Sequence, residues 1–577
     1  MFKPLGMSEV SIFVMNNDLK QVTDLLYDLK FIEFFKKDVE KFDNFEHQNL
    51  NELSGDLLKL RSAIAVLHEY YSGDSGKYEE NALEMTHDLK KKETDLIKKI
   101  GKLEEAIERE EILHKLGIDR DDIKSKKYLI GFVDLKEENK LKNFSREKIK
   151  FKKYRKKERV YFAAETKKIS FKFKEFYIPD KFEKNISEEL LKNKKELENT
   201  KKNLKNLANS SLKHLQKEEF HVSREVSTFE EKTKFLKTSN MCVMTGFVPK
   251  VETKKLEMSL NKILGDRYEM EVKPAKGDVP TKLSNGVISG NFESLIKMYS
   301  IPRYNEIDPT FLMLLVFPIF YGFILGDAGY GLTSLIIFTL AKMKFKSISG
   351  FISILQLSSI SAIFFGFLYG EFFGFKPYYI LSRAEMPETL LLIALIFGLI
   401  HINLGLFVGF LNDLNNHSLT HAIYHKLSWM VLQLGVGALA FGIYVSEEII
   451  LGLGIGILLA AFVLLYLGHG FIGIIEIPTF FTNILSYSRL MAFGLSKVAI
   501  AMLINQYSAV MIGMGIAGII GAIILFTIGH TFNIVVGNFA SFLHTLRLHY
   551  VEFFTKFYNG GGREFVPFGE RIHENSK

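Results

Sequence analysis

Apolar residues dominate the chain after residue 309, in runs long enough for membrane helices. A helix needs about 20 mostly apolar residues to cross the hydrocarbon core of a bilayer. The runs predict eight spans, near residues 310–325, 329–341, 350–370, 389–411, 427–445, 449–470, 481–512 and 519–555. The first two are short, and the GDAGYG segment between them suggests a tight turn within the membrane. If residues 310–341 instead form one bent helix, seven spans result.

Before residue 275 the pattern alternates between short strands and long charged helices. Segments 8–35 and 241–274 each predict strand, helix and strand, and residues 127–178 add further strands, so small α/β lobes are expected. Residues 78–115 and 183–238 are rich in Lys and Glu, with apolar residues three and four apart. They predict an antiparallel coiled-coil arm with an α/β lobe between its two helices. A pair of solvated surface helices is the alternative.

The charged residues divide the chain into two parts. Residues 1–300 hold 112 of the 140 Lys, Arg, Asp and Glu residues, and residues 301–577 hold the remaining 28. We therefore expect a water-soluble arm of α/β lobes and antiparallel helices over 1–300, joined through a Pro- and Gly-containing hinge at 275–309 to an α-helical membrane domain over 301–577. The net charge of +8 is too small to indicate nucleic-acid binding.

Loop charges predict the orientation in the membrane. With eight spans, Lys342, Lys344, Lys346 and Lys426 fall on the side of the N-terminus, whereas Glu447 and Glu448 fall on the opposite side. Cytoplasmic loops carry an excess of Lys and Arg. Both termini are thus expected in the cytosol of a multi-pass cell-membrane protein. The single cysteine, Cys242, excludes an intramolecular disulfide, which fits a reducing compartment for the arm.

Two arginines stand out in the last two apolar runs, because a charge inside a membrane helix is costly and tends to mark a function. Arg489 lies in the seventh run, on a face shared with Thr482, Ser486 and Ser496. In the eighth run, polar or small residues recur three and four apart: His530, Asn533, Gly537, Ser541, His544 and Arg547. A turn near residue 518 would bring both arginines to similar depth. Snorkelling or a buried ion pair explains a lone arginine equally well, but two beside a polar stripe favour a functional site.

Other polar residues in the apolar half have simpler explanations. Glu371 and Glu476 are intramembrane or interfacial acids. His401, inside the fourth run, is expected to make a helix–helix hydrogen bond rather than to relay ions. Asp327, beside glycines, is expected to form a turn or a helix cap.

Three blocks carry a resemblance to a known family. They are FPIFYGFILGDAGYGL (317–332), EIPTFFTNILSYSRLMAFGL (476–495) and FASFLHTLRLHYVEFFTKFYNGGGREFVPF (539–568). Over nearly all of 280–577 the chain resembles the membrane subunit a/I of V/A-type (vacuolar/archaeal-type) ATPases, and before that only in general layout. The resemblance implies an eight-helix membrane domain against a rotor ring of proteolipid subunits, and a cytosolic arm that contacts peripheral stalk subunits.

The resemblance also assigns roles to residues. It implies that the ring-facing arginine is Arg489, that the second arginine is Arg547, and that Glu476 and His544 lie near the ion path. Together with the polar faces, this gives a set of expected ion-translocation residues: Arg489, Arg547, Glu476, His544, Ser486, His530, Asn533 and Ser541.

Elementary chemistry agrees with that role for an arginine. A guanidinium stays ionised, so it favours the ionised form of a rotor carboxylate and promotes release of bound H⁺ or Na⁺. It also repels cations that would leak between two offset half-channels. The chain has no GxxxxGKS/T loop, so we expect neither ATP hydrolysis by this chain alone nor a bound cofactor.

Two other classes of protein compete with this interpretation. A secondary transporter with a cytosolic regulatory domain would show internal repeats, and none is clear across 310–577. A structural scaffold would carry the same arginines as inert ion pairs. Neither H⁺ nor Na⁺ is favoured by the sequence, because the selective carboxylate would lie on another chain.

Overall fold

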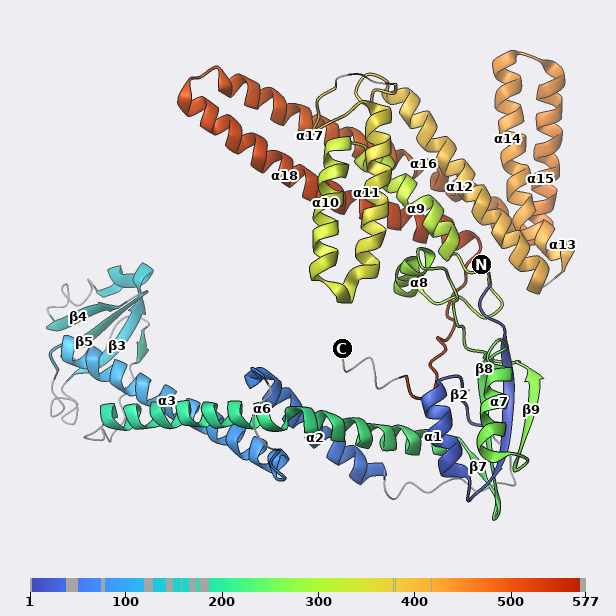
Figure 1. Cartoon of the computed structure of the whole chain (residues 1–577). Coiled ribbons are helices and arrows are strands. Elements are labelled where there is room, and N and C mark those ends of the chain that lie inside the picture. Colours follow the sequence, from blue (N-terminus) through green and yellow to red (C-terminus); the bar gives the residue numbers. More distant parts are fainter. Residues whose placement is uncertain are drawn as a thin grey trace. The chain divides into compact units, whose positions relative to one another are not determined.

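The chain folds into two compact units. The computed structural model describes residues 3–37, 50–73, 78–118, 128–141, 149–156, 158–165, 173–175, 186–376, 378, 380–416 and 418–570. Unit 1 comprises Met1–Asn44 with Lys234–Arg571, and unit 2 comprises Phe45–Thr233 with Ile572–Lys577. Figure 1 labels the elements of both.

Unit 2 is built around one long helix. Helix α6 (Ile186–Lys232) packs along both α2 (Leu50–Tyr70) and α3 (Ala82–Lys115), because all three direct apolar side chains into a shared core that includes Leu60, Leu67 and Leu204. The sequence predicted α3 and α6 but not α2, so three helices pack where two were expected. A coiled coil in the strict sense stays a prediction.

A small antiparallel sheet lies between α3 and α6 in the chain. Its strand order is β4-β5-β3-β6, formed by β3 (Leu129–Asp134), β4 (Phe151–Lys156), β5 (Arg159–Ala164) and β6 (Lys174–Glu175), with a 3₁₀ turn at Leu135–Leu141. This confirms strands in the predicted region 127–178. The parts of that region, and of the predicted helix 183–238, that fall at 142–148, 157, 166–172 and 176–185 lie outside the described residues.

Unit 1 begins with an α/β lobe assembled from both predicted strand–helix–strand segments. Its antiparallel sheet has the order β2-β8-β1-β9, with β7 also paired to β8. Strand β1 is central and pairs from Met7 to Met15 with β8. The elements are β1 (Met7–Met15), α1 (Leu19–Leu29), β2 (Glu33–Phe34), β7 (Leu236–Lys237), β8 (Met241–Pro249), α7 (Thr253–Leu264) and β9 (Tyr268–Pro274).

The C-terminal segment returns to this lobe. Arg563 forms an ion pair with Glu33, and the Val566 backbone N–H donates to the Glu33 carboxylate at 2.9 Å. The ring of Phe568 meets Tyr27 edge-on at 5.3 Å. The lobe thus belongs to the same compact unit as the apolar helices, whereas the predicted division at residue 300 placed it with the arm. The functional division into 1–300 and 301–577 stays a prediction.

The apolar half is helical throughout. After η2 (Ser289–Phe292) and α8 (Glu293–Tyr299) come α9 (Thr310–Leu325), α10 (Ala328–Lys344), η3 (Lys346–Ile348), α11 (Ser349–Tyr369), α12 (Pro387–Asn416), α13 (Leu419–Ala422), η4 (Ile423–Leu427), α14 (Ser428–Val445), α15 (Glu448–Ile475), α16 (Ile477–Leu485), α17 (Ser488–Ile512), α18 (Ile516–Arg547), η5 (Leu548–Phe553) and η6 (Phe554–Lys556). Both η4 and η5 are π-helical. Neighbouring segments run on as continuous helices over 419–445 and 516–556.

Six of these helical segments are long and apolar enough to cross a membrane, by length and composition. Helix α9 is apolar but shorter, at 16 residues, and α10 has 17 residues with two lysines in its last turn. The count of eight therefore stays a prediction. Residues 310–341 are not one bent helix, because the chain turns at Gly326, where φ is +36°, and restarts at Asp327.

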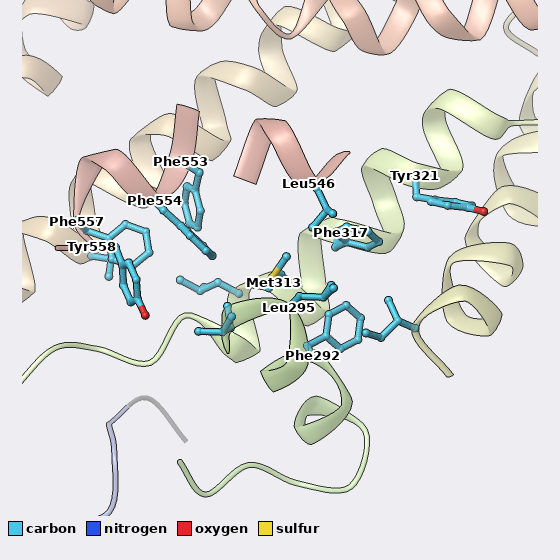
Figure 2. Packing of buried hydrophobic residues seen from close by; sticks show 14 of the residues in the cluster. Phe292, Leu295, Met313, Phe317, Tyr321, Leu546, Phe553, Phe554, Phe557 and Tyr558 are labelled. Carbon is cyan, nitrogen blue, oxygen red and sulfur yellow. The ribbon is translucent and has the colours of Figure 1, made fainter. Parts of the chain in front are cut away.

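An aromatic cluster fixes the C-terminal end of α18 against α9 and the hinge (Figure 2). Phe317 and Met313 of α9 pack with Phe292 and Leu295 from η2 and α8, and with Phe553 beyond α18, all buried. Each fully buried large apolar side chain contributes about 1.5–3 kcal/mol relative to exposure. The cluster therefore positions the end of α18, where the predicted site lies.

We expect the orientation of the apolar helices to be measurable by cysteine labelling. In a Cys242→Ser background, a cysteine at the exposed position Glu447 should react with a membrane-impermeant maleimide applied from outside the cell. A cysteine at the exposed position Lys346 should react only after permeabilisation. Labelling of both positions from the same side contradicts the eight-span arrangement.

A second prediction concerns a buried carboxylate in unit 2. Glu93 is 3% exposed and accepts hydrogen bonds from the Tyr70 hydroxyl at 2.6 Å and from Lys90. Burial alone would raise the pKa of Glu93, but these hydrogen bonds outweigh it and hold the pKa below its ordinary value. The resulting stability is complete above the ordinary Glu pKa and is lost as the pH falls below it.

Glu93→Gln should therefore lower the free energy of unfolding by about 1–3 kcal/mol near neutral pH and flatten its dependence on acid pH. Urea unfolding of a fragment spanning residues 45–233, followed by circular dichroism, measures both. Glu105→Gln, at an exposed ion pair with Arg109, is the matched control and should leave stability unchanged. Equal behaviour of the two variants would refute the assignment.

Candidate functional site

The last two apolar helices form a hairpin that brings the two arginines to one end. Helices α17 and α18 pack together and are joined by the short turn at 513–515. Arg489 is the second residue of α17, and Arg547 is the last residue of α18. The imidazole of His544 stacks on Phe493 of α17 at 3.6 Å, and the charges of both arginines act on it. The two arginines thus lie at the same end of the hairpin, near His544.

Arg489 has a counter-charge in its own chain. Its Nη1 donates to Oε1 of Glu552 at 3.2 Å. The Glu552 side chain is 2% exposed, whereas that of Arg489 is 30% exposed. The sequence led us to name Glu371 and Glu476 among the acids of the apolar half, but not Glu552. The η5 segment carries Glu552 back beside the start of α17.

The helix tightens locally just before Arg489. Ser486 and Tyr487 lie between α16 and α17. The Ser486 hydroxyl donates to the Thr482 carbonyl at 3.1 Å. Ser486 and Tyr487 keep helical φ and ψ, and residues 477–512 run as one helical segment, so the predicted shared face of Thr482, Ser486, Arg489 and Ser496 stays a prediction.

Two of the predicted ion-translocation residues, Arg547 and Glu476, do not belong to the Arg489–Glu552 pair. Arg547 is exposed, and within the described part of the chain it makes no ion pair. Glu476 is exposed and occupies the N-cap position of α16, where its charge acts on Lys556. Within the part of the chain that the structure describes, neither Arg547 nor Glu476 is paired with Glu552.

His530 and Asn533 belong to a second, fully hydrogen-bonded network in the middle of the hairpin. Asn533 Nδ2 donates to the Tyr330 hydroxyl at 2.9 Å and to the Lys497 carbonyl at 3.1 Å. The Tyr330 hydroxyl lies 2.7 Å from His530 Nδ1, and His530 Nε2 lies 2.9 Å from Asn505 Oδ1. Because Asn505 uses its amide N–H on the Phe373 carbonyl, its oxygen accepts from His530. The ring is then neutral, with its proton on Nε2.

Ser541 lies on the same buried face of α18 as His530 and Asn533. Its side chain is 0% exposed, and its hydroxyl has no hydrogen-bond partner among the described residues.

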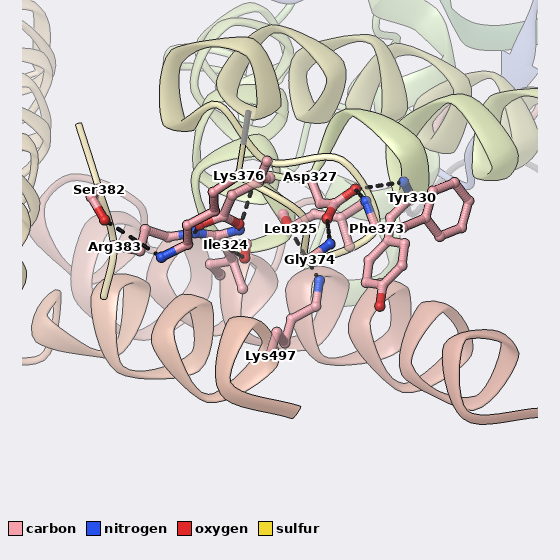
Figure 3. Close-up of polar contacts among 12 residues, drawn as sticks. Ile324, Leu325, Asp327, Tyr330, Phe373, Gly374, Lys376, Ser382, Arg383 and Lys497 are labelled. Carbon is pink, nitrogen blue, oxygen red and sulfur yellow. Dashed lines mark hydrogen bonds and ion pairs between the residues drawn. The ribbon is translucent and has the colours of Figure 1, made fainter. Parts of the chain in front are cut away.

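A cluster of four buried ionisable side chains adjoins this network (Figure 3). Arg383 forms an ion pair with Glu371 and donates to the Ile324 and Gly326 carbonyls at 3.1 and 2.6 Å. Lys497, 6% exposed, donates to the Leu325 carbonyl at 3.4 Å. With Asp327, the cluster contains two basic and two acidic side chains, all buried.

Asp327 is a helix cap, as expected. Its carboxylate accepts backbone N–H groups from Tyr330 at 2.9 Å, Phe373 at 3.0 Å and Gly374 at 2.9 Å. It therefore joins the start of α10 to the loop after α11. His401 is also a helix–helix hydrogen bonder, since its Nδ1 lies 2.8 Å from the Tyr487 hydroxyl.

The sequence did not lead us to predict five residues of the site: Glu552, His549, Lys497, Arg383 and Asn505. Glu552 and His549 continue the three-to-four spacing of the α18 stripe through η5, and this periodicity was the available signal. Lys497 and Arg383 have no comparable signal, because only the packing of distant segments shows that they are buried. No group of three or more His, Cys, Asp or Glu side chains in the described ranges could hold a metal ion.

This arrangement defines a class of protein. Successive helices long and apolar enough to span a bilayer carry a buried Arg–Glu pair and a partly exposed arginine on a helix hairpin, which is typical of a multi-pass membrane protein. A sequence profile of the V-type ATPase 116kDa subunit family matches residues 155–389 and 480–569. The chain belongs to this family.

Curated relatives agree with the family. An A-type ATP synthase subunit I from Archaeoglobus fulgidus is 34% identical over 422 residues, which cover 61% of this chain and 62% of that protein. A protein of the same description from Methanocaldococcus jannaschii is 33% identical, over 58% of this chain and 56% of its own length. The V-type ATP synthase subunit I of Borreliella burgdorferi is 26% identical, over 54% and 57%. The chain thus spans less than two thirds of the length of these relatives.

A solved structure also overlaps part of the chain. The cytoplasmic N-terminal domain of subunit I, homolog of subunit a, of V-ATPase, is 12% identical, covers 46% of this chain and 99% of its own, and superposes with a TM-score of 0.25. A score this low carries no argument about the fold.

The capping role of Asp327 generates a prediction. Asp327→Asn keeps the size of the side chain but removes the charge and replaces one acceptor oxygen with an NH2 donor, so the three N–H groups lose the carboxylate charge and at least one of them loses its acceptor. We expect the free energy of unfolding to fall by about 1–3 kcal/mol, seen as a lower Tm of the purified protein in detergent. Glu447→Gln is the control, because Glu447 is exposed and its side chain caps no N–H group. Equal Tm values for both variants would contradict the capping role.

Proposed function

We propose that this chain is the stationary membrane subunit of a rotary V/A-type ATPase. It forms ion half-channels against a rotor ring of proteolipid subunits, and it couples H⁺ or Na⁺ movement to ATP hydrolysis or synthesis on other subunits. The observation that carries this proposal is the state of Arg489: a guanidinium held by a buried carboxylate on one side and 30% exposed on the other.

The exposed apolar face of α18 fits an apolar partner. On α18 large apolar side chains recur three and four apart on the face opposite the polar stripe, and they are 44–65% exposed: Ile528, Phe532, Val535, Phe539 and Leu543. Such a stripe suits lipid or the apolar helices of a ring. Helix α18 alone is about 48 Å long at 1.5 Å per residue, longer than the roughly 30 Å hydrocarbon core, so it must tilt or protrude.

Glu552 adds a step to the action of Arg489. While no rotor carboxylate is near, the guanidinium is held by Glu552 at 3.2 Å. An arriving rotor carboxylate competes for the exposed side of the guanidinium, which favours its ionised form and releases its bound ion. The guanidinium stays charged throughout. Glu552 therefore keeps Arg489 compensated between encounters, because an uncompensated charge at this depth is costly.

A polar cleft supports water access from one side. It has a volume of about 800 Å³ and is lined by Asp413, Asn416, Lys426, Thr555 and residues of the hinge. Thr555 is three residues beyond Glu552. The lysines of this region belong to the predicted cytosolic side, so the cleft suits the cytosolic approach to the Arg489–Glu552 pair. His530, Asn533 and Ser541 suit the approach from the other side.

The remaining parts of the proposal follow from charge and composition. Eight membrane spans place both termini in the cytosol, in a cell membrane. The charged helices α2, α3 and α6, with the sheet between α3 and α6, form the arm that anchors the peripheral stalk subunits. ATP is bound and hydrolysed by other subunits of the complex.

The inert-scaffold alternative gains one argument from the structure, because Arg489 and Glu552 could simply neutralise each other. Glu552→Gln distinguishes the two functions. If the Arg489–Glu552 pair is purely structural, the variant complex transports ions normally once it has assembled. If Arg489 belongs to the ion path, ion transport depends on Arg489 beyond its effect on assembly.

Variants of the arginines test the proposal. Arg489→Ala should lower ATP-driven ion uptake by about 100-fold or more, since it removes a preorganised charge. Arg489→Lys should also be severely impaired, because an ammonium lacks the planar fork and loses its proton more readily when desolvated. Arg547→Ala is the matched control and should be milder, because Arg547 is exposed and lacks an ion pair among the described residues. Uptake is compared in vesicles at equal content of assembled complex; near-normal uptake by Arg489→Ala would rule out the proposal.

A further inference from the structure

The segment that leads into α8 is apolar on two sides. On its inner side, Phe292 and Leu295 are 1% and 0% exposed and belong to the aromatic cluster of Figure 2. On its outer side, Val287 and Ile288 are 93% and 64% exposed, and Met298 of α8 is 69% exposed. The outer apolar side is therefore left for a partner outside the chain's own core.

Hydrogen bonds hold the turn at residues 285–288 in place. The Asn285 side-chain amide donates to the carboxylates of Glu293 and Asp308, both at 2.8 Å. The Gly286 carbonyl accepts the backbone N–H of Gly290 at 2.7 Å. Single exposed apolar residues are ordinary, whereas a contiguous apolar group held in one position marks an interaction site.

The turn lies at the end of the helix bundle where α10 passes into α11. The adjoining η2 packs against α9 and α11, and a Cβ at Gly350, in the first turn of α11, would lie 3.2 Å from Asn291 Oδ1. Figure 1 shows α8 at the level of the connection between α10 and α11. The exposed apolar face of α10 runs to this end, with side chains that are 47–74% exposed: Leu332, Ile336, Ile337, Leu340 and Met343.

The connection between α10 and α11 alternates basic and apolar side chains. Lys342, Lys344 and Lys346 are exposed, and Phe345 and Ile348 are 52% and 53% exposed. The sequence holds no Asp or Glu from 328 to 370, so the charge of this connection is of one sign. Lysines beside exposed apolar side chains are typical of segments that lie in the boundary between headgroups and acyl chains.

We propose that residues 285–288 and 342–348 form one anchor in the cytosolic leaflet of the membrane. Its apolar side chains enter the boundary between headgroups and acyl chains, and its three lysines bind the phosphate groups of anionic phospholipids. The loop charges predict that this end of the bundle is cytosolic, and the cytosolic leaflet carries the negative surface potential. Lipid is the occupant because the apolar surface continues that of a membrane helix and its charge is opposite to that of the headgroups.

The anchor acts on the segment that joins the N-terminal lobe to the membrane helices. On the inner side of this segment, the Phe292 ring meets Phe317 of α9 edge-on at 6.1 Å. Lipid on the outer side then holds the same segment from the opposite direction. A ligand that binds only the folded form stabilises it in proportion to its concentration, so anionic phospholipid should stabilise this chain.

Fluorescence quenching tests whether the turn enters the bilayer. In a Cys242→Ser background, Val287→Cys is labelled with an environment-sensitive fluorophore, and the full chain is placed in nanodiscs of phosphatidylethanolamine and phosphatidylglycerol. We expect quenching by a lipid spin-labelled near the headgroup end of its acyl chain, and protection from aqueous iodide. Val251→Cys, 65% exposed in the turn after β8, is the matched control and should show the reverse. Equal access of iodide to both positions would overturn the anchor.

Lysine variants test the contact with headgroups. Phosphatidylglycerol added to the purified full chain in detergent should raise its Tm, and phosphatidylcholine should raise it less. Each lysine near an anionic surface strengthens binding by about fivefold. A variant that combines Lys342→Gln, Lys344→Gln and Lys346→Gln should therefore need about tenfold or more phosphatidylglycerol for the same rise.

The matched control for charge combines three exposed lysines of α7, changed as Lys254→Gln, Lys255→Gln and Lys262→Gln, and should respond as the wild type does. An equal response of the two triple variants to phosphatidylglycerol would refute the binding of headgroups by the α10–α11 connection. Neither measurement requires ion transport, so both test the anchor apart from the proposed function.

Discussion

A charge inside an apolar helix bundle must have a partner, and this requirement explains the arrangement of the membrane half of the chain. Arg383 meets Glu371 and two backbone carbonyls. Arg489 meets Glu552, which lies 63 residues later in the chain. In each case the partner is supplied by a separate helix or loop, so satisfying the charge also fixes how those elements pack. An intact buried ion pair contributes little net stability, whereas removal of one member is strongly destabilising. Such pairs therefore determine how the helices are arranged more than how stable the fold is.

Departures from regular helix place these partners. Gly326 adopts φ of +36°, and Tyr369 occupies the space that a Cβ there would need, so α9 ends and Asp327 can cap α10. The local tightening between α16 and α17 directly precedes Arg489. The π-helical η5 turns His549 and Glu552 into the bundle directly after Arg547, which remains exposed. Insertions of this kind often accompany function, because they direct side chains that a regular 3.6-residue period would leave on the surface.

The N-terminal lobe and the C-terminal segment of unit 1 are also held together by a compensated buried charge. Burial raises the pKa of Glu33, and the cost of burying its charge is offset by Arg563 and by the Val566 backbone N–H. The C-terminal segment therefore closes the lobe formed by the first strand and the strands after α6.

The sequence alone determined the elements and the class of protein. The apolar runs gave helices near the observed bounds, since membrane length and hydropathy leave few choices, and strand patterns gave β1, β8 and β9 closely. Spacing placed Arg489 and Arg547 at a similar depth, because a short turn forces a helix hairpin to align its ends. Tertiary structure decided which of these residues are paired. Glu552, His549, Lys497 and Arg383 acquired their roles only when distant helices packed, as did the single sheet formed by β1 with β8 and β9. A one-dimensional pattern records the face on which a residue lies, whereas its partner depends on where other helices break and turn.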